Sequence, residues 1–156
     1  MIRPARESDV PAILSLIREL AEYEKLTHAC VASTEHFIQH LFGPNPAAEA
    51  MVAEVDGRTI GYAIWFRTFS TFLGRPGIYL EDVYVQPAHR GKGIGKAFLK
   101  HLARLAVERN YGRIEWSVLT WNEPSIGFYK SLGAQPLDEW KMMRLTGEEL
   151  KAFASD

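Results

Sequence analysis

Apolar residues along the chain recur with two spacings, one typical of strands and one typical of helices. The period of two, together with short runs rich in Val, Ile, Tyr and Phe, predicts strands at residues 2–5, 50–55, 58–69, 79–85, 113–119 and 139–145. Asp56-Gly57, between the second and third of these strands, is a strong signal for a tight hairpin. The strand pattern therefore predicts a sheet with several consecutive antiparallel strands.

Spacings of three and four predict the helices. A first helix follows Ser8 as its N-cap, with an apolar face of Ile13, Leu14, Ile17, Leu20 and Ala21. A second covers residues 34–41, and a third follows the glycines near residue 93 and buries Phe98, Leu99, Leu102, Leu105 and Ala106. A fourth begins after Asn122, contains Pro124 in its first turn and stops at Gly133. Thr146 and Glu149 form a capping box for a terminal helix.

The order of elements predicts one α/β domain spanning residues 1–156. Strand, two helices, three strands, helix, strand, helix and strand build a central mixed, mostly antiparallel sheet with helices on both faces. The loops at 43–46 and 70–77 contain Gly and Pro, and no linker, repeat or low-complexity tract divides the chain. A length of 156 residues suits a single domain.

Charge and composition narrow the functional classes. A formal net charge of −1 argues against a nucleic-acid surface. No apolar run approaches the ~18 residues of a membrane span, and Met1 leads directly into structured sequence. The single Cys30 fits a reducing compartment. These features predict a cytoplasmic protein without a membrane or nucleic-acid partner.

The most informative stretch is RGKGIG, residues 90–95, between a strand and a helix. Glycine lets a ligand approach the backbone closely, and the N–H groups of a first helical turn have no partner within the helix. With Arg90 and Lys92 beside them, these groups form a site for phosphate or pyrophosphate. A purely structural helix start is the alternative.

Two common phosphate motifs do not fit this stretch. A Walker A motif needs GxxxxGK followed by Ser or Thr, which the chain lacks. The dinucleotide fingerprint needs GxGxxG, but here the third glycine, Gly95, comes one residue early. The pattern Arg90-x-x-Gly93-x-Gly95 instead resembles the acetyl-CoA signature of the GNAT superfamily of N-acetyltransferases.

Further motifs extend this resemblance over nearly the whole chain. NEPSIGFYKSLGA at 122–134 is similar to the segment that follows the signature in GNAT enzymes. AEYEKL at 21–26, YLEDVYV at 79–85, RGKGIG and WNEPS resemble the diamine (spermidine/spermine) and thialysine acetyltransferase branch, in the same order. The resemblance implies a GNAT fold in which the strands at Val83 and Val118 splay apart to admit the pantetheine arm of acetyl-CoA.

The resemblance also implies the residues that hold acetyl-CoA. Main-chain groups of Val83, Tyr84 and Val85 pair with the pantetheine arm as an added strand would. The pyrophosphate lies on Arg90, Gly91, Lys92, Gly93, Ile94, Gly95 and Lys96. The far wall comprises Asn122, Glu123, Pro124, Ser125 and Tyr129. No metal is implied.

Tyr129 carries over as the general acid. The departing CoA thiolate needs a proton, and a phenol beside the sulfur can supply it. The alternative is a core aromatic, since Phe128 and Leu132 lie nearby at helical spacing.

Glu81 and Asp82 are carboxylates within an otherwise apolar strand, where strict alternation would place them on opposite faces. An ion pair with a nearby Arg or Lys, or a solvated strand end, is the structural alternative. The resemblance makes Glu81 a base acting through water and Asp82 a contact for the cationic acceptor. An amine with a pKa near ~10.4 must lose a proton before it attacks.

The resemblance places further residues in the acceptor site: Tyr23, Glu24, Glu115, Trp116, Ser117 and Glu139. Glu139 lies in a region shorter than in the branch. His36 and His40 have i, i+4 spacing, for which we expect a solvated helix face.

Together these features predict an acetyl-CoA-dependent N-acetyltransferase that acts directly on a primary amine of a small cationic molecule. One alternative is the same chemistry on an amino acid, an aminoglycoside or a protein N-terminus. Another is a non-catalytic CoA-binding regulatory module, although Tyr129 and Glu81 would not be needed for binding alone. The resemblance also implies a homodimer.

Overall fold

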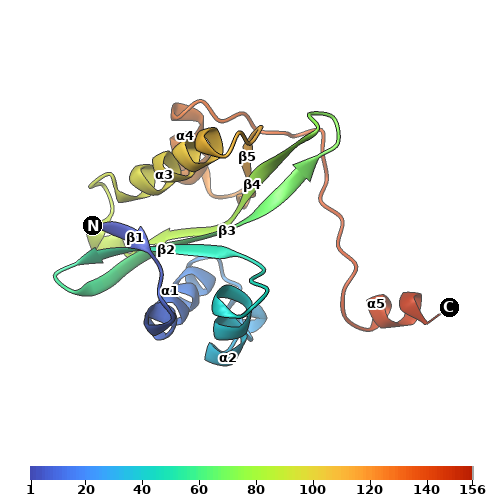
Figure 1. Ribbon diagram of the computed structural model, residues 1–156, viewed down its shortest axis with the longest axis horizontal. Coiled ribbons are helices and arrows are strands. Elements are labelled where there is room, and N and C mark those ends of the chain that lie inside the picture. The colour runs from blue at the N-terminus through green and yellow to red at the C-terminus, as the bar shows by residue number, and fades with distance from the viewer. Residues whose placement is uncertain (156) are drawn as a thin grey trace. The chain divides into compact units, whose positions relative to one another are not determined.

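The computed structural model describes residues 1–155 and contains a five-stranded mixed sheet (Figure 1). Its strands lie in sequence order: β1 (Ile2–Pro4), β2 (Glu49–Val55), β3 (Arg58–Ser70), β4 (Arg75–Val85) and β5 (Ile114–Trp116). The first four are antiparallel, and β5 runs parallel to β4. The predicted hairpin between β2 and β3 is confirmed, with positive φ angles of 49° at Asp56 and 74° at Gly57.

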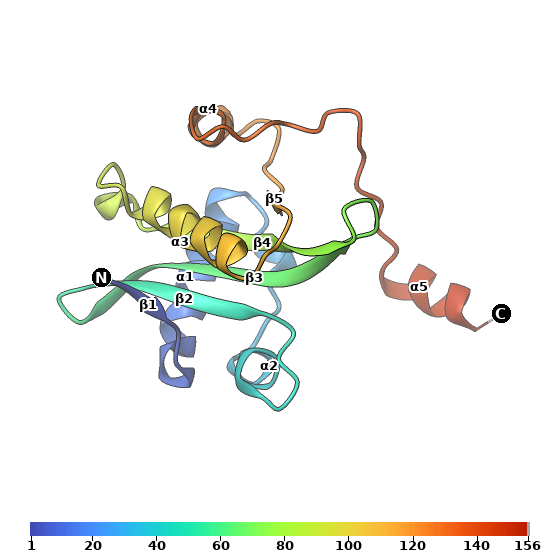
Figure 2. The same ribbon diagram turned by 45° about the horizontal axis from the view of Figure 1, so that its top comes forward.

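Helices cover both faces of this sheet, as predicted (Figures 1 and 2). On one face lie α1 (Val10–Tyr23) and α2 (Thr34–Phe37), which continues as a π-helical turn, η3 (Ile38–Phe42). On the other lies α3 (Ile94–Glu108). Three short 3₁₀ turns connect these elements: η1 (Glu7–Asp9), η2 (Thr27–Ala29) and η4 (Pro87–His89).

The core follows the alternation of side chains along β3. Tyr62 and Ile64 pack in a buried cluster with Ile13 and Leu16 of α1 and with Val52 and Tyr84. On the opposite face, a β-carbon at Gly61 would lie 3.4 Å from the ring of Phe98 in α3 and only 2.8 Å from the main-chain oxygen of Tyr84, and the second contact explains why that position has no side chain. The sheet is thus sandwiched between α1 and α3.

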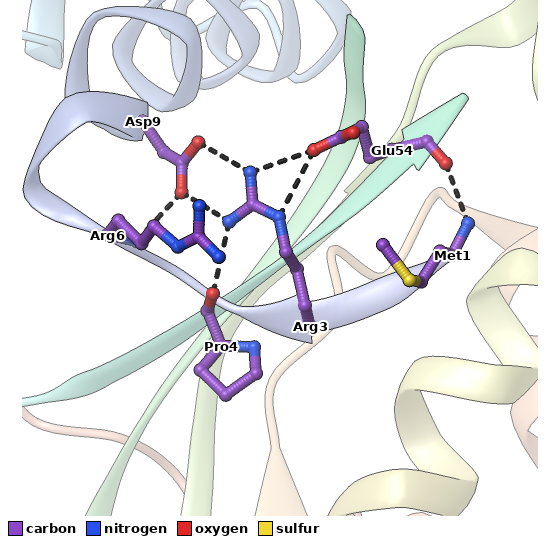
Figure 3. A network of polar contacts seen from close by, with 6 residues as sticks. All are labelled: Met1, Arg3, Pro4, Arg6, Asp9 and Glu54. Carbon is purple, nitrogen blue, oxygen red and sulfur yellow. Dashed lines mark hydrogen bonds and ion pairs between the residues drawn. The ribbon is translucent and has the colours of Figure 1, made fainter. Parts of the chain in front are cut away.

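An ionic network ties β1 to β2 and to the start of α1 (Figure 3). Arg3 donates to both carboxylate oxygens of Asp9, at 2.7 and 2.9 Å, and to Oε2 of Glu54, at 2.9 Å. Asp9 also accepts from the main-chain N–H of Arg6 at 2.7 Å. These bonds hold the pKa of Asp9 below its usual value.

The chain forms two compact units, Met1–Ser117 and Val118–Asp156. Within the second, α4 (Glu123–Ser131) and α5 (Gly147–Ala154) are helical. Asn122 caps α4 as predicted, because its side chain accepts from the N–H of Ser125 at 3.4 Å. Gly133 follows α4 with φ 95°, the conformation expected of a C′ glycine.

Several predicted boundaries were wrong. Residues 139–145 form no strand, and the predicted strand 113–119 is reduced to β5. Asp9 rather than Ser8 is the N-cap of α1, because η1 adds a turn before it. The loop predicted at 70–77 is shorter, since β4 begins at Arg75. Thr146 is the N-cap of α5, but its side chain makes no capping hydrogen bond.

Candidate active site

A β-bulge lies where the two carboxylates interrupt β4. Ile64 pairs with Asp82 and Trp65 pairs with Leu80, so Glu81 has no partner on β3. Such a bulge breaks the strict alternation from which we predicted opposite faces for Glu81 and Asp82. Asp82 lies on the α1 face, Glu81 is exposed, and the charge of Glu81 is close enough to raise the pKa of Asp82.

Beyond the bulge, β4 has an open edge. Its pairing with β5 covers Ile78 to Leu80 and stops at Trp116, whereas β4 continues to Val85. No other described strand pairs with Glu81–Val85 on that side. An extended ligand can therefore add to this edge by main-chain hydrogen bonds, as predicted for Val83, Tyr84 and Val85.

The glycine-rich turn before α3 exposes the main-chain groups that a pyrophosphate requires. Gly91 and Gly93 have φ angles of 74° and 80°, and a β-carbon at either would meet no atom within 4 Å. Gly93 is the N-cap of α3 and offers no capping side chain, so the first-turn amides of Ile94, Gly95 and Lys96 face the helix end without one. The turn fits a phosphate-bearing cofactor.

The side chain of Arg90 contacts β4 and the end of α1 and so stabilises this turn. Its Nε donates to the main-chain oxygen of Val85 at 2.8 Å, and its guanidinium lies 5.4 Å from the ring of Tyr23 and 5.3 Å from that of Tyr84. Lys92 is exposed. Arg90 therefore joins the phosphate turn to the end of α1, where Tyr23 was predicted in the acceptor site.

A pocket of about 420 Å³ opens on the α1 side of the sheet. Its polar lining consists of Glu24, Cys30, His36 and Asp82. The remainder is largely apolar and includes Ile17, Leu20, Ala21, Leu26, Ala29, Val31 and Ala32. Because Tyr23 contacts Arg90 and Glu24 lines the pocket, the C-terminal end of α1 reaches both the phosphate turn and the pocket.

The carboxylates in the pocket lining favour the binding of a cation. Burial, together with the charges of Glu81 and Glu24, raises the pKa of Asp82 to about 6 against the opposing hydrogen bond from Tyr62. Burial also raises the pKa of Glu24. Neither lysine nor arginine lines the pocket among the residues described. An ammonium group bound there would relieve the repulsion between these carboxylates.

The predicted acceptor residues on β5 have partners of their own. Glu115 forms an ion pair with Arg113, with Nε and Oε1 2.9 Å apart. The hydroxyls of Ser117 and Tyr79 lie 2.6 Å apart, and Trp116 is half-buried opposite Leu80. None of the three lines the 420 Å³ pocket, so their part in acceptor binding stays a prediction.

The remaining predicted residues belong to the second unit. Tyr129 is half-buried, its ring centroid lies 5.5 Å from that of Phe128, and no residue of α4 is buried. The role of Tyr129 as the general acid therefore stays a prediction. Glu123, Pro124 and Ser125 form the first turn of α4, whereas Glu139 is exposed outside any helix or strand.

Sequence reasoning missed Tyr62, which contacts a pocket residue, and Cys30 and His36, which line the pocket. Tyr62 donates to Oδ2 of Asp82 at 3.3 Å. His36 is also exposed, as expected for a solvated helix face. The signal for Tyr62 was a tyrosine among apolar residues of a core strand. No group of three or more potential metal-ligating side chains occurs in the described part of the chain.

The glycine-rich helix start, the open edge of β4 and the acidic pocket suit a transferase that binds a phosphate-bearing donor and a small acceptor. Residues 13–134 match the model of the acetyltransferase (GNAT) family. The chain belongs to this family and is an acyltransferase with acetyl-CoA as its donor.

Curated relatives agree with this assignment. The chain is 40% identical to thialysine N-epsilon-acetyltransferase of Mus musculus, with 98% of this chain and 96% of the relative covered. It is 31% identical to L-ornithine N5-acetyltransferase NATA1 of Arabidopsis thaliana, covering 97% and 86%. It is 35% identical to spermidine/spermine N(1)-acetyltransferase-like protein 1 of Homo sapiens, covering 98% of this chain and 23% of that protein.

Solved structures share the fold. An integron cassette protein from the mobile metagenome of V. cholerae superimposes with a TM-score of 0.83 at 26% identity, covering 100% of this chain and 98% of the other. A ribosomal-protein-alanine N-acetyltransferase from Brucella melitensis, at 24% identity and a TM-score of 0.73, shows the fold alone.

Among the described residues, no helix is both long and apolar enough to cross a bilayer.

Proposed function

We propose that this enzyme transfers the acetyl group of acetyl-CoA directly to a primary amine of a small cationic molecule of the diamine, polyamine or thialysine type. The acidic pocket carries this proposal, because Glu24 and Asp82 are both partly desolvated and no Lys or Arg stands among the described residues of the lining. Relatives that act on thialysine and ornithine support a small amine with a charged chain. The pocket volume of about 420 Å³ suits a small molecule better than a folded protein.

In this proposal each part of the chain has a separate task. The amides of Gly91 to Lys96 bind the pyrophosphate, and the open edge of β4 binds the pantetheine arm. Asn122 to Ser125 form the far wall of the cofactor site. Asp82 and Glu24 attract the ammonium, with Tyr23, Glu115, Trp116, Ser117 and Glu139 as further contacts of the acceptor.

The chemistry needs three proton transfers. The ammonium loses a proton to Glu81, directly or through water, and the lone pair of the resulting amine attacks the thioester carbonyl carbon. When the carbon–sulfur bond breaks, Tyr129 donates its phenolic proton to the departing thiolate, and the second proton that the nitrogen loses as the amide forms returns to the phenolate, directly or through water. The exposed position of Glu81 at the bulge supports this role, because a base that exchanges protons with water must reach water.

The proposal also covers the domain organisation, the oligomeric state and the localisation of the enzyme. We propose one catalytic domain, supported by a family match that crosses the boundary between the two units, and a cytoplasmic homodimer that uses no metal. Exposed Trp140, Met142 and Met143, at 75%, 69% and 87%, are apolar surface that a second copy could cover. A fully active monomer by light scattering would rule out a required dimer.

The experiment that tests the acceptor class is the dependence of KM on charge. Glu24→Gln should raise the KM for a cationic amine roughly 5- to 50-fold with little change in kcat, because a cation contact in a partly desolvated pocket is lost. Higher ionic strength should raise the KM for the amine more than the KM for acetyl-CoA.

Glu22→Gln is the matched control, since Glu22 precedes Glu24 by two residues, is exposed and does not line the pocket. An amine KM that responds to neither Glu24→Gln nor salt would indicate a neutral acceptor.

A further inference from the structure

We propose that Tyr62 is a positioning residue of the acceptor site, whose hydroxyl holds Asp82 in its anionic form and thereby sets the pH at which the pocket captures a cation. The inference rests on the proposed function, because it assigns Asp82 to the binding of the acceptor amine.

The position of the Tyr62 hydroxyl is fixed by the core. The side chain is fully buried, and its ring packs with Ile13 and Leu16 of α1 and lies 6.4 Å from the ring of Tyr84. Its hydroxyl donates to Oδ2 of Asp82 across the β3–β4 pair, at 3.3 Å. A ring held this firmly cannot follow the carboxylate, so the hydrogen bond fixes the carboxylate instead.

Burial and two neighbouring carboxylates favour the protonated form of Asp82. Glu81 precedes it on β4, and Glu24 faces it from the end of α1. Burial acts in the same direction, and together these influences bring the pKa of Asp82 to about 6. Cys30 and His36 line the same pocket from the segment after η2 and from α2. The hydrogen bond from Tyr62 is the one described influence that lowers this pKa.

The consequence concerns the empty pocket, before an amine arrives. Once bound, a cation itself stabilises the carboxylate, but it is attracted only if the carboxylate is already charged. Without the Tyr62 hydroxyl, Asp82 would remain protonated to a higher pH, and the pocket would have a weaker field for the incoming amine. The phenol therefore acts through Asp82 and need not contact the substrate.

Tyr62→Phe tests this, because it removes one oxygen and keeps the ring in the core. In protein labelled with ¹³C at aspartate carboxyl groups, the Asp82 signal, assigned by its loss in Asp82→Asn, should titrate roughly one pH unit higher in Tyr62→Phe. The acid limb of the KM for the amine should move upward by the same amount. The kcat at saturating amine and the KM for acetyl-CoA should stay near wild type.

A double mutant separates positioning from general damage to the fold. In the Asp82→Asn background, Tyr62→Phe should have no further effect on the KM profile, since the group through which it acts is gone. An Asp82 signal that titrates at the wild-type pH in Tyr62→Phe, or an equal KM effect in both backgrounds, would overturn the proposal.

Two features keep the test decisive. The NMR titration needs no acceptor, so it gives a result even if the proposed amine substrates prove wrong. If Tyr62→Phe does not fold, a deuterium isotope shift on the Asp82 carboxyl carbon of the wild-type protein reports the hydrogen bond itself, and its absence would contradict the proposal.

Discussion

At the scale of single residues, adjacent carboxylates on one strand have different environments and suit different tasks. Asp82 is turned toward the pocket on the α1 face and titrates with a pKa raised to about 6, so it suits attraction of a cation. Glu81 lies exposed at the bulge, where proton exchange with water is possible. In the proposed mechanism, the bulge thus separates acceptor binding by Asp82 from proton transfer by Glu81.

Glu81→Gln should lower kcat/KM at neutral pH by roughly 10²–10⁴, the range for one general acid–base group. The loss should shrink as pH rises toward the pKa of the free amine near ~10.4, because an increasing share of the amine is then already deprotonated. A pH profile of kcat/KM for wild type and variant measures this. A deficit that stays constant at every pH would assign the base to another residue.

Tyr129→Phe should also lower kcat by roughly 10²–10⁴, but without recovery at high pH, since deprotonating the amine does nothing for the departing thiolate. Thermal unfolding and acetyl-CoA binding should remain near wild type, because the ring is retained. Phe128→Leu provides a control on packing, as Phe128 is the ring neighbour of Tyr129 on α4. Near-normal turnover by Tyr129→Phe would remove it from the mechanism.

The sequence predicts single residues best where a motif specifies both residue and neighbours. RGKGIG, Glu24 and Asp82 are found in the phosphate turn and in the pocket, in line with the resemblance. Tyr62 was not predictable as a partner of Asp82, because they are 20 positions apart and meet only through the β3–β4 register. Cys30 reaches the pocket from the irregular segment between α1 and α2, which has no periodic pattern, and His36 reaches it from the short helix α2 that follows this segment.

At the scale of secondary-structure elements, our proposal assigns donor binding to the start of α3. Acetyl-CoA should raise the melting temperature of the wild type, as a ligand of the folded state does. Gly93→Glu should abolish that rise, because it places a carboxylate where the phosphates bind and forces a side chain onto φ 80°. Thermal shift against acetyl-CoA concentration measures both effects.

Gly57→Glu is the matched control for this substitution. Gly57 has φ 74° and open space around its β-position, but it lies in the hairpin between β2 and β3. It should suffer the same backbone strain and keep the full rise with acetyl-CoA. An equal rise in Gly93→Glu would place the phosphates elsewhere.

The network at β1 should matter for stability rather than catalysis. Arg3→Ala should lower the free energy of unfolding by about 2–3 kcal/mol, since Arg3 and Asp9 side chains are only 17% and 10% exposed and Asp9 would lose its partner. Arg109→Ala, which breaks the more exposed pair with Glu49, should cost at most about 1 kcal/mol. Urea unfolding of both variants makes the comparison.

The difference in free energy of unfolding between wild type and Arg3→Ala should change with pH in one direction. Because the pKa of Asp9 is lowered in the folded state, its stabilisation is fully present above the unfolded value of 3.8 and is lost as pH falls through the folded one. The gap between wild type and Arg3→Ala should therefore narrow below about pH 4. A gap that widens on acidification would contradict the assigned pairing.

Helices and strands were predicted correctly where the local sequence pattern and the tertiary contacts favour the same structure. The strands that form β2 and β3 and the apolar faces of α1 and α3 were evident from periodicity, and Phe98, Leu102 and Ala106 are buried as expected. Residues 139–145 alternate like a strand, but a strand exists only where another strand pairs with it, which sequence pattern alone does not reveal. The bulge at Glu81 was likewise invisible, since it depends on register with β3.

At the scale of the whole molecule, a net charge of −1 conceals a strong local separation of charge. Arg90, Lys92 and Lys96 surround the phosphate turn, whereas Glu24, Glu81 and Asp82 gather at and beside the pocket. Opposite local potentials suit an enzyme that must bind an anionic donor and a cationic acceptor together. The end of α1, with Tyr23 at one site and Glu24 at the other, is the described element that links them.

The most direct test of the account is acetyl transfer itself, measured as CoA release from acetyl-CoA by the purified protein. The acceptors are thialysine, lysine, ornithine, a diamine, spermidine, a neutral aromatic amine and a peptide with a free N-terminus, with each product identified by mass spectrometry. We predict turnover with one or more of the small cationic amines, acetylated on a primary amine, and little with the neutral amine or the peptide. Acetylation of the peptide or the neutral amine, with none of the small cations accepted, would contradict the account.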